Sequence, residues 1–246
     1  MPRFFVQADN IASDTVTITG DDAWHIARAL RMAVGERVTV CDGEGNEHDC
    51  TLTAITDTAA TAHIDGTQVS ASEMPFTAVL YQALPKGDKM DLIVQKAVEQ
   101  GAAVIVPFLS ERCISRPDDK AMAKKLQRWQ RIAVEAAKQC GRGILPTVTP
   151  PLSYSEMLAA VRADSLCCFC YEGAGTRSLR AVLTEADLPK GGRVSVVIGS
   201  EGGFSEKEAD AARDAGVALC GLGRRILRCE SASGFALACL SYQFEL

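Results

Sequence analysis

The chain has 246 residues, 47% of them hydrophobic and 23% charged, which suits one large or two smaller packed domains. Its formal net charge of −5 disfavours a general polyanion-binding protein. No apolar run approaches the ~20 residues of a membrane span, and the N-terminus lacks the basic and apolar regions of a signal peptide. We therefore expect a cytoplasmic protein with no membrane partner.

Residues 1–70 are predicted to form a small β-barrel or sandwich. Short runs of alternating polarity occur at 15–18, 37–43, 49–55 and 60–64, and glycine-containing turn signals separate them, Asp65-Gly66 among them. One helix is expected to interrupt these strands, around residues 22–32.

The pattern changes after a junction at residues 70–75, and strands and helices alternate to the C-terminus. Such alternation with apolar strands predicts a mostly parallel sheet covered on both faces, so residues 74–246 form a second, α/β domain. The expected strands are 77–84, 103–109, 165–171, 193–199 and 217–222. The expected helices are 89–100, 119–140, 155–162, 177–186, 206–215 and one from about residue 231.

Ten cysteines lie mostly inside apolar runs, which is typical of reduced, buried side chains in a cytosolic protein. The segment from Cys167 to Cys170 is formally a C-x-x-C motif. No second pair at similar spacing accompanies it, so we interpret it as part of a buried strand and expect no metal site.

Charge is distributed unevenly. Residues 1–72 contain four arginines and eleven acidic residues, whereas residues 107–145 contain nine basic and four acidic residues. A basic stretch in an acidic protein suggests either a nucleic-acid face or a solvated helix surface.

The glycine-rich turn GSEGGFS follows the apolar run that ends at Ile198, a position where α/β proteins bind ligands. It lacks the Lys-Ser/Thr of a phosphate-binding loop and the spacing of a dinucleotide turn. Its Glu201 competes with phosphate for the helix amides, and Ser205 with Glu208 forms a capping box. The pattern therefore favours a positively charged nucleoside over a phosphate ligand.

A second glycine turn, GLGRRILRCESASG at 221–234, follows the next strand. It places Arg224, Arg225, Arg228 and Glu230 within seven residues, with two apolar residues between the arginines. This turn is either a basic loop with two core anchors or a loop that closes over a ligand and directs a guanidinium at it.

Motifs along nearly the whole chain resemble those of the RsmE family, SPOUT-class enzymes that methylate N3 of a uridine in 16S ribosomal RNA. They are R-F-F at 3–5, H-x₄-L-R-x₃-G at 25–35, K-G-D-K-M-D at 86–91, Q-K-A-V-E-Q-G at 95–101, E-A-A-K-Q-C-G-R at 135–142, I-G-S-E-G-G at 198–203 and L-G-x-R-I-L-R-x-E-S-A at 222–232. Their order and spacing make the resemblance specific. Ser200 replaces a usual proline and Ser231 a usual threonine.

The resemblance implies a PUA-like β-barrel followed by a SPOUT domain with a deep C-terminal trefoil knot, which the general rarity of knots would argue against. It also implies a homodimer that binds S-adenosyl-L-methionine and acts on 16S rRNA within the small ribosomal subunit. The implied cofactor-binding residues are Tyr171, Glu172, Gly173, Ile198, Gly199, Ser200, Glu201, Gly202, Gly203, Leu222, Gly223, Ile226 and Leu227.

Methylation at N3 requires an aligned methyl donor and a uracil that has lost its N3 proton. A positioned arginine stabilises the resulting anion on the flanking carbonyl oxygens. We expect Arg228 to do this, with Arg225 as second choice, and Glu230 either to orient an arginine or to take the proton. The candidate RNA-binding residues are Arg3, Arg28, Arg31, Arg112, Arg116, Lys124, Arg128, Arg131, Lys138 and Arg142.

Three other interpretations remain. The protein is alternatively a SPOUT methyltransferase acting on another RNA site, which the N-terminal motifs disfavour. It is alternatively a non-catalytic RNA-binding assembly factor, which the intact second glycine turn disfavours, or a nucleotide-dependent oxidoreductase, which the missing dinucleotide spacing disfavours.

Overall fold

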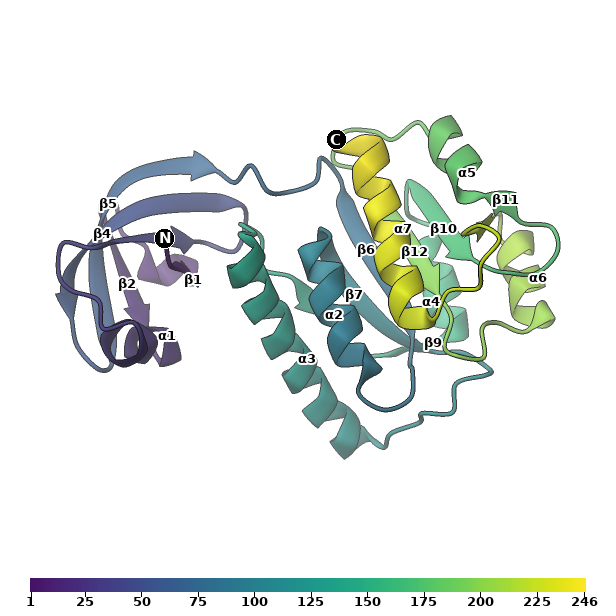
Figure 1. Ribbon diagram of the computed structural model, residues 1–246, viewed down its shortest axis with the longest axis horizontal. Coiled ribbons are helices and arrows are strands. Elements are labelled where there is room, and N and C mark those ends of the chain that lie inside the picture. The colour runs from purple at the N-terminus through teal and green to yellow at the C-terminus, as the bar shows by residue number, and fades with distance from the viewer. The chain divides into compact units, whose positions relative to one another are not determined.

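A computed structural model describes all residues, 1–246. The chain forms two compact units (Figure 1). One comprises Met1–Glu73 and Ala137–Leu145, and the other comprises Met74–Ala136 and Pro146–Leu246.

The first unit is built on a five-stranded sheet in the order β1-β3-β4-β5-β2. Strand β1 runs parallel to β3 and the remaining pairs are antiparallel. Alternate residues such as Val16, Ile18 and Leu52 point into one buried core, as the sequence pattern predicts for half-buried strands. The strands are β1 (Arg3–Phe5), β2 (Thr15–Thr19), β3 (Arg37–Cys41), β4 (Asn46–Ile55) and β5 (Ala59–Val69), and the helical segments are η1 (Ala8–Asn10), α1 (Asp21–Trp24) and η2 (His25–Ala29).

Three details of this unit differ from the sequence-based prediction. Strand β1 has only three residues, too few for a periodic pattern to reveal it. Asp65-Gly66 does not end a strand: β5 continues to Val69, and a register shift between Asp49 and Cys50 of β4 accommodates the extra residue as a β-bulge. The helix expected over 22–32 is one α-helical turn followed by a short π-helix.

A buried ion pair connects the segment Ala137–Leu145 to the rest of the first unit, residues Met1–Glu73. Arg142 is 3% exposed, and its Nη2 lies 2.6 Å from Oε2 of Glu73. Glu73 also accepts hydrogen bonds from the backbone amides of Gly143 and Ile144. An ion pair buried with additional hydrogen bonds is costly to break, so this carboxylate holds the turn after helix α3 (Asp119–Cys140).

The second unit contains an eight-stranded sheet in which β9 pairs with β7 and the other strands follow the order β11-β13-β10-β12-β6-β7-β8. All of its strand pairs are parallel, as predicted from the strand–helix alternation. The strands are β6 (Thr77–Ala83), β7 (Ala102–Leu109), β8 (Thr147–Val148), β9 (Leu152–Ser153), β10 (Leu166–Cys170), β11 (Arg177–Ser178), β12 (Arg193–Ile198) and β13 (Ala218–Gly221).

Helices cover this sheet. Helices α2 and α7 pack side by side, with α7 against β6 and β12, while α4 packs against β7 and α6 against β13 (Figure 1). The helices are α2 (Lys89–Glu99), α3 (Asp119–Cys140), α4 (Tyr154–Val161), α5 (Leu179–Glu185), α6 (Glu206–Asp214) and α7 (Cys229–Phe244). The trefoil knot implied by the resemblance stays a prediction.

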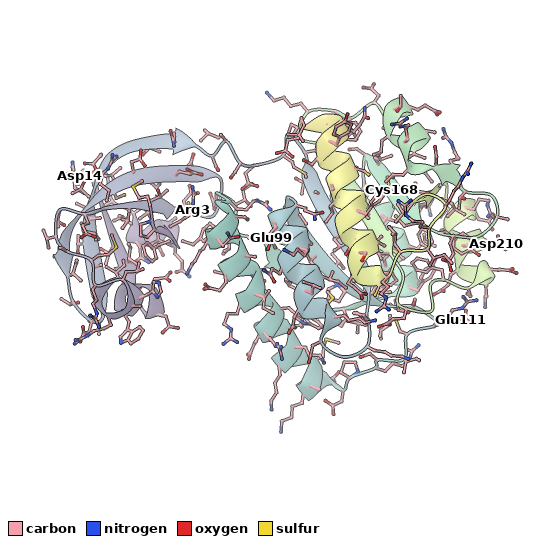
Figure 2. The ribbon with its side chains drawn as sticks, viewed as in Figure 1. Arg3, Asp14, Glu99, Glu111, Cys168 and Asp210 are labelled. Atoms are coloured by element: carbon pink, nitrogen blue, oxygen red, sulfur yellow. The ribbon has the colours of Figure 1, made fainter.

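Several local predictions are confirmed. Ser205 and Glu208 form the capping box that starts α6, and Gly101, directly after the C-cap of α2, has a φ of +89° that favours glycine. The ten cysteines are all free, and Cys168 is fully buried in β10 (Figure 2). No helix is both long and apolar enough to cross a bilayer.

Candidate functional site

Three loops meet at the carboxyl edge of the parallel sheet. Strand β10 lies between β12 and β13, so the segments that follow these three strands emerge side by side. They are the turn after Cys170, the glycine-rich turn after Ile198 and the arginine-rich loop after Gly221. This edge is where open α/β sheets bind ligands.

Between these loops lies a cavity of about 590 Å³, large enough for a nucleoside-sized ligand. The predicted residues that line it are Tyr171, Glu172, Ile198, Gly199, Ser200, Glu201, Gly203, Leu222, Gly223, Arg225, Ile226, Leu227 and Arg228. Gly173, Gly202 and Glu230 do not line it. The lining residues that the prediction did not include are Lys89, Cys170, Thr176, Phe204, Gly221, Arg224, Cys229 and Ala232.

The glycines that do not line the cavity shape its walls. A Cβ on Gly173 would lie 2.3 Å from Cε1 of Tyr171, so only glycine lets that ring pack against the backbone. A Cβ on Gly202 would lie 3.0 Å from Cβ of Arg112, whose Nη1 donates to the Gly202 carbonyl at 2.9 Å. Both glycines therefore act on the loops and not on the cavity surface.

Phe204 anchors the glycine-rich turn to the sheet by packing against aromatic residues of two strands. Its ring centroid lies 4.3 Å from that of Phe169 on β10 and 6.2 Å from that of Phe108 on β7. Phe108 and Phe169 are completely buried, so the turn rests on the core of the sheet. Sequence reasoning missed Phe204, although its place directly after the glycines was a usable signal.

The arginine-rich loop leaves its backbone polar groups open. The backbone N–H and C=O groups of residues 222–227 make no hydrogen bond to another part of the chain. Gly223 has a φ of +113°, a conformation that glycine adopts readily. Unpaired backbone groups that face a cavity are available to a bound ligand.

A charge cluster lies at the cavity rim, where Lys89 of α2 contacts the glycine-rich turn and approaches the first turn of α7. Its Nζ lies 2.8 Å from Oε1 of Glu201 and 3.9 Å from Oε2 of Glu230. The backbone amide of Lys86 also donates to Oε1 of Glu201 at 3.0 Å. Glu201 therefore joins the glycine-rich turn to the start of α2.

These contacts determine the ionisation of Glu201. Partial burial by itself raises the pKa of this carboxyl, but the hydrogen bonds from Lys89, from its own amide and from the Lys86 amide outweigh burial and place the pKa below the usual range. The hydrogen bond to Glu201 in turn raises the pKa of Lys89. Both groups are charged at neutral pH.

Glu230 is also held in its ionised form. A hydrogen bond from its own amide lowers its pKa, and Cys229 and the charges of Lys89 and Arg228 act in the same direction against burial. Cys229 Sγ lies 3.2 Å from Oε2 of Glu230, and burial together with this carboxylate raises the pKa of the thiol to about 12. A carboxylate with a lowered pKa accepts a proton less readily.

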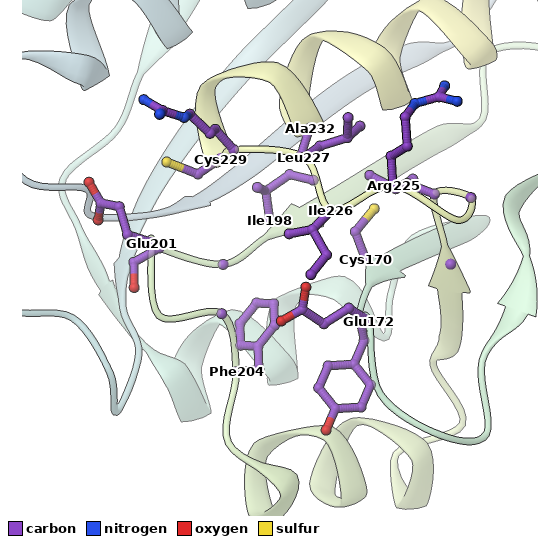
Figure 3. A pocket seen from close by; sticks show the side chains of 18 of the residues that line it. Cys170, Glu172, Ile198, Glu201, Phe204, Arg225, Ile226, Leu227, Cys229 and Ala232 are labelled. Atoms are coloured by element: carbon purple, nitrogen blue, oxygen red, sulfur yellow. The ribbon is translucent and has the colours of Figure 1, made fainter.

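Figure 3 shows where the labelled side chains point. The Glu172 carboxylate is directed into the cavity, between Phe204 and Ile226, whereas the Arg225 guanidinium is directed away from them. Ile226 is 83% exposed and extends from its loop toward Glu172. Glu172 has no ion pair or hydrogen bond, in contrast to Glu201.

The electrostatics differ from the sequence-based interpretation. The negative charge of Glu201 was expected to favour a positively charged ligand, but Lys89 pairs with this carboxylate. The charged lining residues are Lys89, Arg224, Arg225 and Arg228 against Glu172 and Glu201, so the lining is net positive. The only unpaired carboxylate of the lining is Glu172.

The predicted RNA-binding residues fall into three groups. Lys124 and Arg131 are exposed on α3, and Arg31 is exposed on the first unit with a φ of +52°. Arg112 and Arg116 donate to backbone carbonyls at 2.9 and 3.2 Å. Carboxylates pair with the remaining five, namely Arg3 with Glu47, Arg28 with Asp57, Arg128 with Asp91, Lys138 with Asp22 and Arg142 with Glu73.

Burial excludes two of these residues from an exposed RNA face. Arg142 is 3% exposed, and Arg3 (Figure 2) is 17% exposed at its side chain and lies 2.8 Å from Glu47. Their positions next to glycines and aromatic residues in the sequence did not reveal these partners, which lie far away along the chain.

Comparison with known proteins agrees with this architecture. Residues 72–241 match the RNA methyltransferase domain family, and residues 18–65 match the RNA methyltransferase PUA domain. The fold is thus a SPOUT-type α/β domain preceded by a PUA-like domain.

Proteins similar to this chain over its whole length include ribosomal RNA small subunit methyltransferases E. The enzyme of Bacillus subtilis is 34% identical over 100% of this chain and 98% of its own length, and that of Synechocystis is 32% identical over 99% and 78%. The crystal structure of the Neisseria gonorrhoeae enzyme bound to S-adenosyl methionine superimposes with a TM-score of 0.84 at 33% identity, covering 98% of this chain and 97% of the other. The chain belongs to the ribosomal RNA small subunit methyltransferase E family.

The charge cluster leads to a prediction about Lys89. Substitution Lys89→Met removes the main hydrogen bond to Glu201, so the pKa of Glu201 rises toward its ordinary value. With Lys89 present, ionised Glu201 adds to the free energy of unfolding at pH values above the ordinary pKa of a glutamate. This contribution is lost as the pH falls through the lowered pKa of Glu201 in the folded protein. The pKa is measured by NMR titration of labelled glutamates.

Lys96→Met is the matched control, because Lys96 pairs with Glu99 at 2.7 Å on the same helix. This variant leaves the Glu201 titration unchanged. An identical Glu201 pKa in the wild type and Lys89→Met would show that the ion pair is not formed in solution.

Proposed function

We propose that the protein transfers a methyl group from S-adenosylmethionine to N3 of a uridine in 16S rRNA of the small ribosomal subunit. The observation that carries this proposal is the cavity between the three loops, most of whose lining residues come from the family's motifs at 198–203 and 222–232. We assign methyl transfer to the α/β unit and RNA recognition mainly to the PUA-like unit. The homodimer implied by the resemblance and the cytoplasmic location expected from the sequence stay predictions.

The residues present fit this methyl donor. The unpaired backbone of residues 222–227 offers donors and acceptors, Ile198, Phe204 and Leu227 offer apolar walls, and Glu172 offers a free carboxylate. Ser200 adds a buried hydroxyl without a hydrogen-bond partner. When bound, S-adenosylmethionine supplies an electrophilic methyl group.

Arg228 is the residue we propose to stabilise the uracil anion. It lines the cavity and is the N-cap residue of α7, so its backbone is anchored by the helix. A guanidinium hydrogen-bonded to a uracil carbonyl oxygen stabilises the charge that develops when N3 loses its proton. Arg225 remains second choice because its side chain is directed away from Glu172 and Ile226 (Figure 3).

Glu230 is better suited to orientation than to proton transfer. Its lowered pKa keeps it ionised, and it is outside the cavity lining. Its side chain lies 3.9 Å from Lys89, so we propose that it positions the start of α7 and with it Arg228.

The proposed RNA face of the α/β unit is the exposed stripe of α3. Lys120, Lys124, Arg128 and Arg131 are spaced at three and four residues and are exposed, whereas Trp129 and Ala133 on the opposite side are buried. Such a stripe suits phosphate groups, and Arg128 also pairs with Asp91.

The first test of this function is binding and methylation by the wild-type protein. Calorimetry should show binding of S-adenosylmethionine and none of ATP or NAD. Small subunits that lack the modification should then acquire N3-methyluridine, detected by mass spectrometry of nucleosides. Methylation confined to another RNA would favour the alternative SPOUT activity, and absence of cofactor binding would favour a non-catalytic assembly factor.

The second test concerns Arg228. The substitution Arg228→Ala should lower the methylation rate by at least ~10²-fold, the usual effect of removing one group that stabilises a developing anion. Arg180→Ala, an exposed arginine on α5, serves as control and retains the wild-type rate. Turnover near that of the wild type in Arg228→Ala would rule out this assignment. A loss of methylation in Arg225→Ala alone would instead assign stabilisation of the uracil anion to Arg225.

The third test concerns the α3 stripe. The double charge reversal Lys124→Glu with Arg131→Glu should weaken binding to small subunits. It should also make the plot of log affinity against log salt concentration less steep by about 0.7–0.9 per lost phosphate contact. Binding of S-adenosylmethionine should not change. Lys190→Glu, on an exposed turn before β12, is the control, and equal losses in RNA and cofactor binding would indicate a structural effect.

A further inference from the structure

We propose that Glu172 is the residue that recognises the ribose of the methyl donor, accepting hydrogen bonds from its 2′- and 3′-hydroxyl groups. This inference rests on the proposed function and assigns one part of the ligand to one side chain. It identifies Glu172 as a specificity-determining residue for a ribonucleoside.

Glu172 is the carboxylate of the cavity lining that is not engaged by another group of the protein. Glu201, the other carboxylate of the lining, is engaged by Lys89 at 2.8 Å and by the Lys86 amide at 3.0 Å. Glu172 has no such partner, although the cavity contains three arginines. Its two oxygens are therefore available to a ligand without the loss of an existing contact.

Glu172 also lies close to the glycine-rich turn. Glu172 follows β10, the central strand of the three, and its Oε1 is only 3.7 Å from where a Cβ on Gly203 would lie. Its carboxylate therefore closely approaches the glycine-rich turn. The packing of the Tyr171 ring against Gly173 restrains the same segment, so the carboxylate is presented from a defined backbone.

Apolar side chains surround the Glu172 carboxylate in the cavity. Phe204 and Ile226 flank the carboxylate (Figure 3), and together with Ile198 and Leu227 they form apolar walls suited to a flat base. A carboxylate beside such a slot accepts hydrogen bonds from the ribose hydroxyls, the same pairing that acidic residues make in dinucleotide-binding folds.

The positive charges of the cavity lining favour the ribose diol over a cationic group of the ligand as the partner of Glu172. S-adenosylmethionine carries a sulfonium and an α-ammonium, either of which a carboxylate would attract. The facing loop, however, brings Arg224, Arg225 and Arg228 to the same cavity. These charges disfavour a further cation there, whereas a neutral diol donates two hydrogen bonds without repulsion.

Calorimetry with three ligands separates these possibilities. The ligands are S-adenosylmethionine, S-adenosylhomocysteine, which lacks the sulfonium charge, and 5′-deoxy-5′-methylthioadenosine, which also lacks the amino-acid moiety. All three retain the ribose diol. The proteins are the wild type, Glu172→Gln and the control Glu206→Gln, which alters an exposed glutamate outside the cavity lining.

We expect Glu172→Gln to weaken binding of all three ligands by a similar factor, about ten- to a hundredfold, because each loses charge-assisted hydrogen bonds. Glu206→Gln should bind them as the wild type does. Equal affinities in Glu172→Gln and the wild type would overturn the proposal. A loss of affinity for S-adenosylmethionine alone would indicate that Glu172 contacts the sulfonium. A loss of affinity for S-adenosylmethionine and S-adenosylhomocysteine, but not for methylthioadenosine, would indicate that it contacts the α-ammonium.

A second measurement compares two ligands, and its first result comes from the wild type alone. The wild type should bind 2′-deoxy-S-adenosylhomocysteine about tenfold more weakly than S-adenosylhomocysteine, and this difference should disappear in Glu172→Gln. Equal affinities of the wild type for the two ligands would overturn the proposal even if the variant did not fold. Failure of the wild type to bind any of these ligands would instead overturn the proposed function and with it the assignment of Glu172.

Discussion

The site depends on one topological constraint, the placement of β10 between β12 and β13 in a parallel sheet. Parallel strands end at the same edge, so the segments after residues 170, 198 and 221 are brought together although they are well separated in the sequence. Each segment has its own support. A tyrosine packed on glycine restrains the first, Phe204 seated on the sheet core anchors the second, and the first turn of α7 ends the third.

A second interaction connects this edge to the rest of the unit. Lys89 contacts Glu201 on one loop and approaches Glu230 at the start of α7, and its helix packs directly against α7. The charge cluster thus couples the glycine-rich turn to the element that presents Arg228. It also gives Glu201 a role in holding the loop, and leaves Glu172 as the carboxylate available to a ligand.

Ion pairing similarly divides the basic residues into those with structural roles and those available for RNA. Arg142 belongs to a sequence element that the resemblance associates with the family, yet it is buried against Glu73. Lys124 and Arg131, which stand in an ordinary amphipathic helix, remain exposed. Positive charge in a sequence is therefore a weak guide to an RNA face, because each buried or paired guanidinium is unavailable to phosphate.

The sequence by itself determined the order and type of the six helices and of five of the eight strands of the second unit. It also determined the capping box at Ser205 and the glycine that ends α2, because these depend on local periodicity and backbone conformation. The three strands that it missed, β8, β9 and β11, have two residues each, too few to show a period. The motifs at 198–203 and 222–232 also identified most of the cavity lining. Only the tertiary structure decided that β10 is central, that Asp65-Gly66 forms a bulge, that Lys89 neutralises Glu201 and that Arg142 is buried. Each of these depends on a partner distant in the chain, and local patterns carry no information about which distant residues pair.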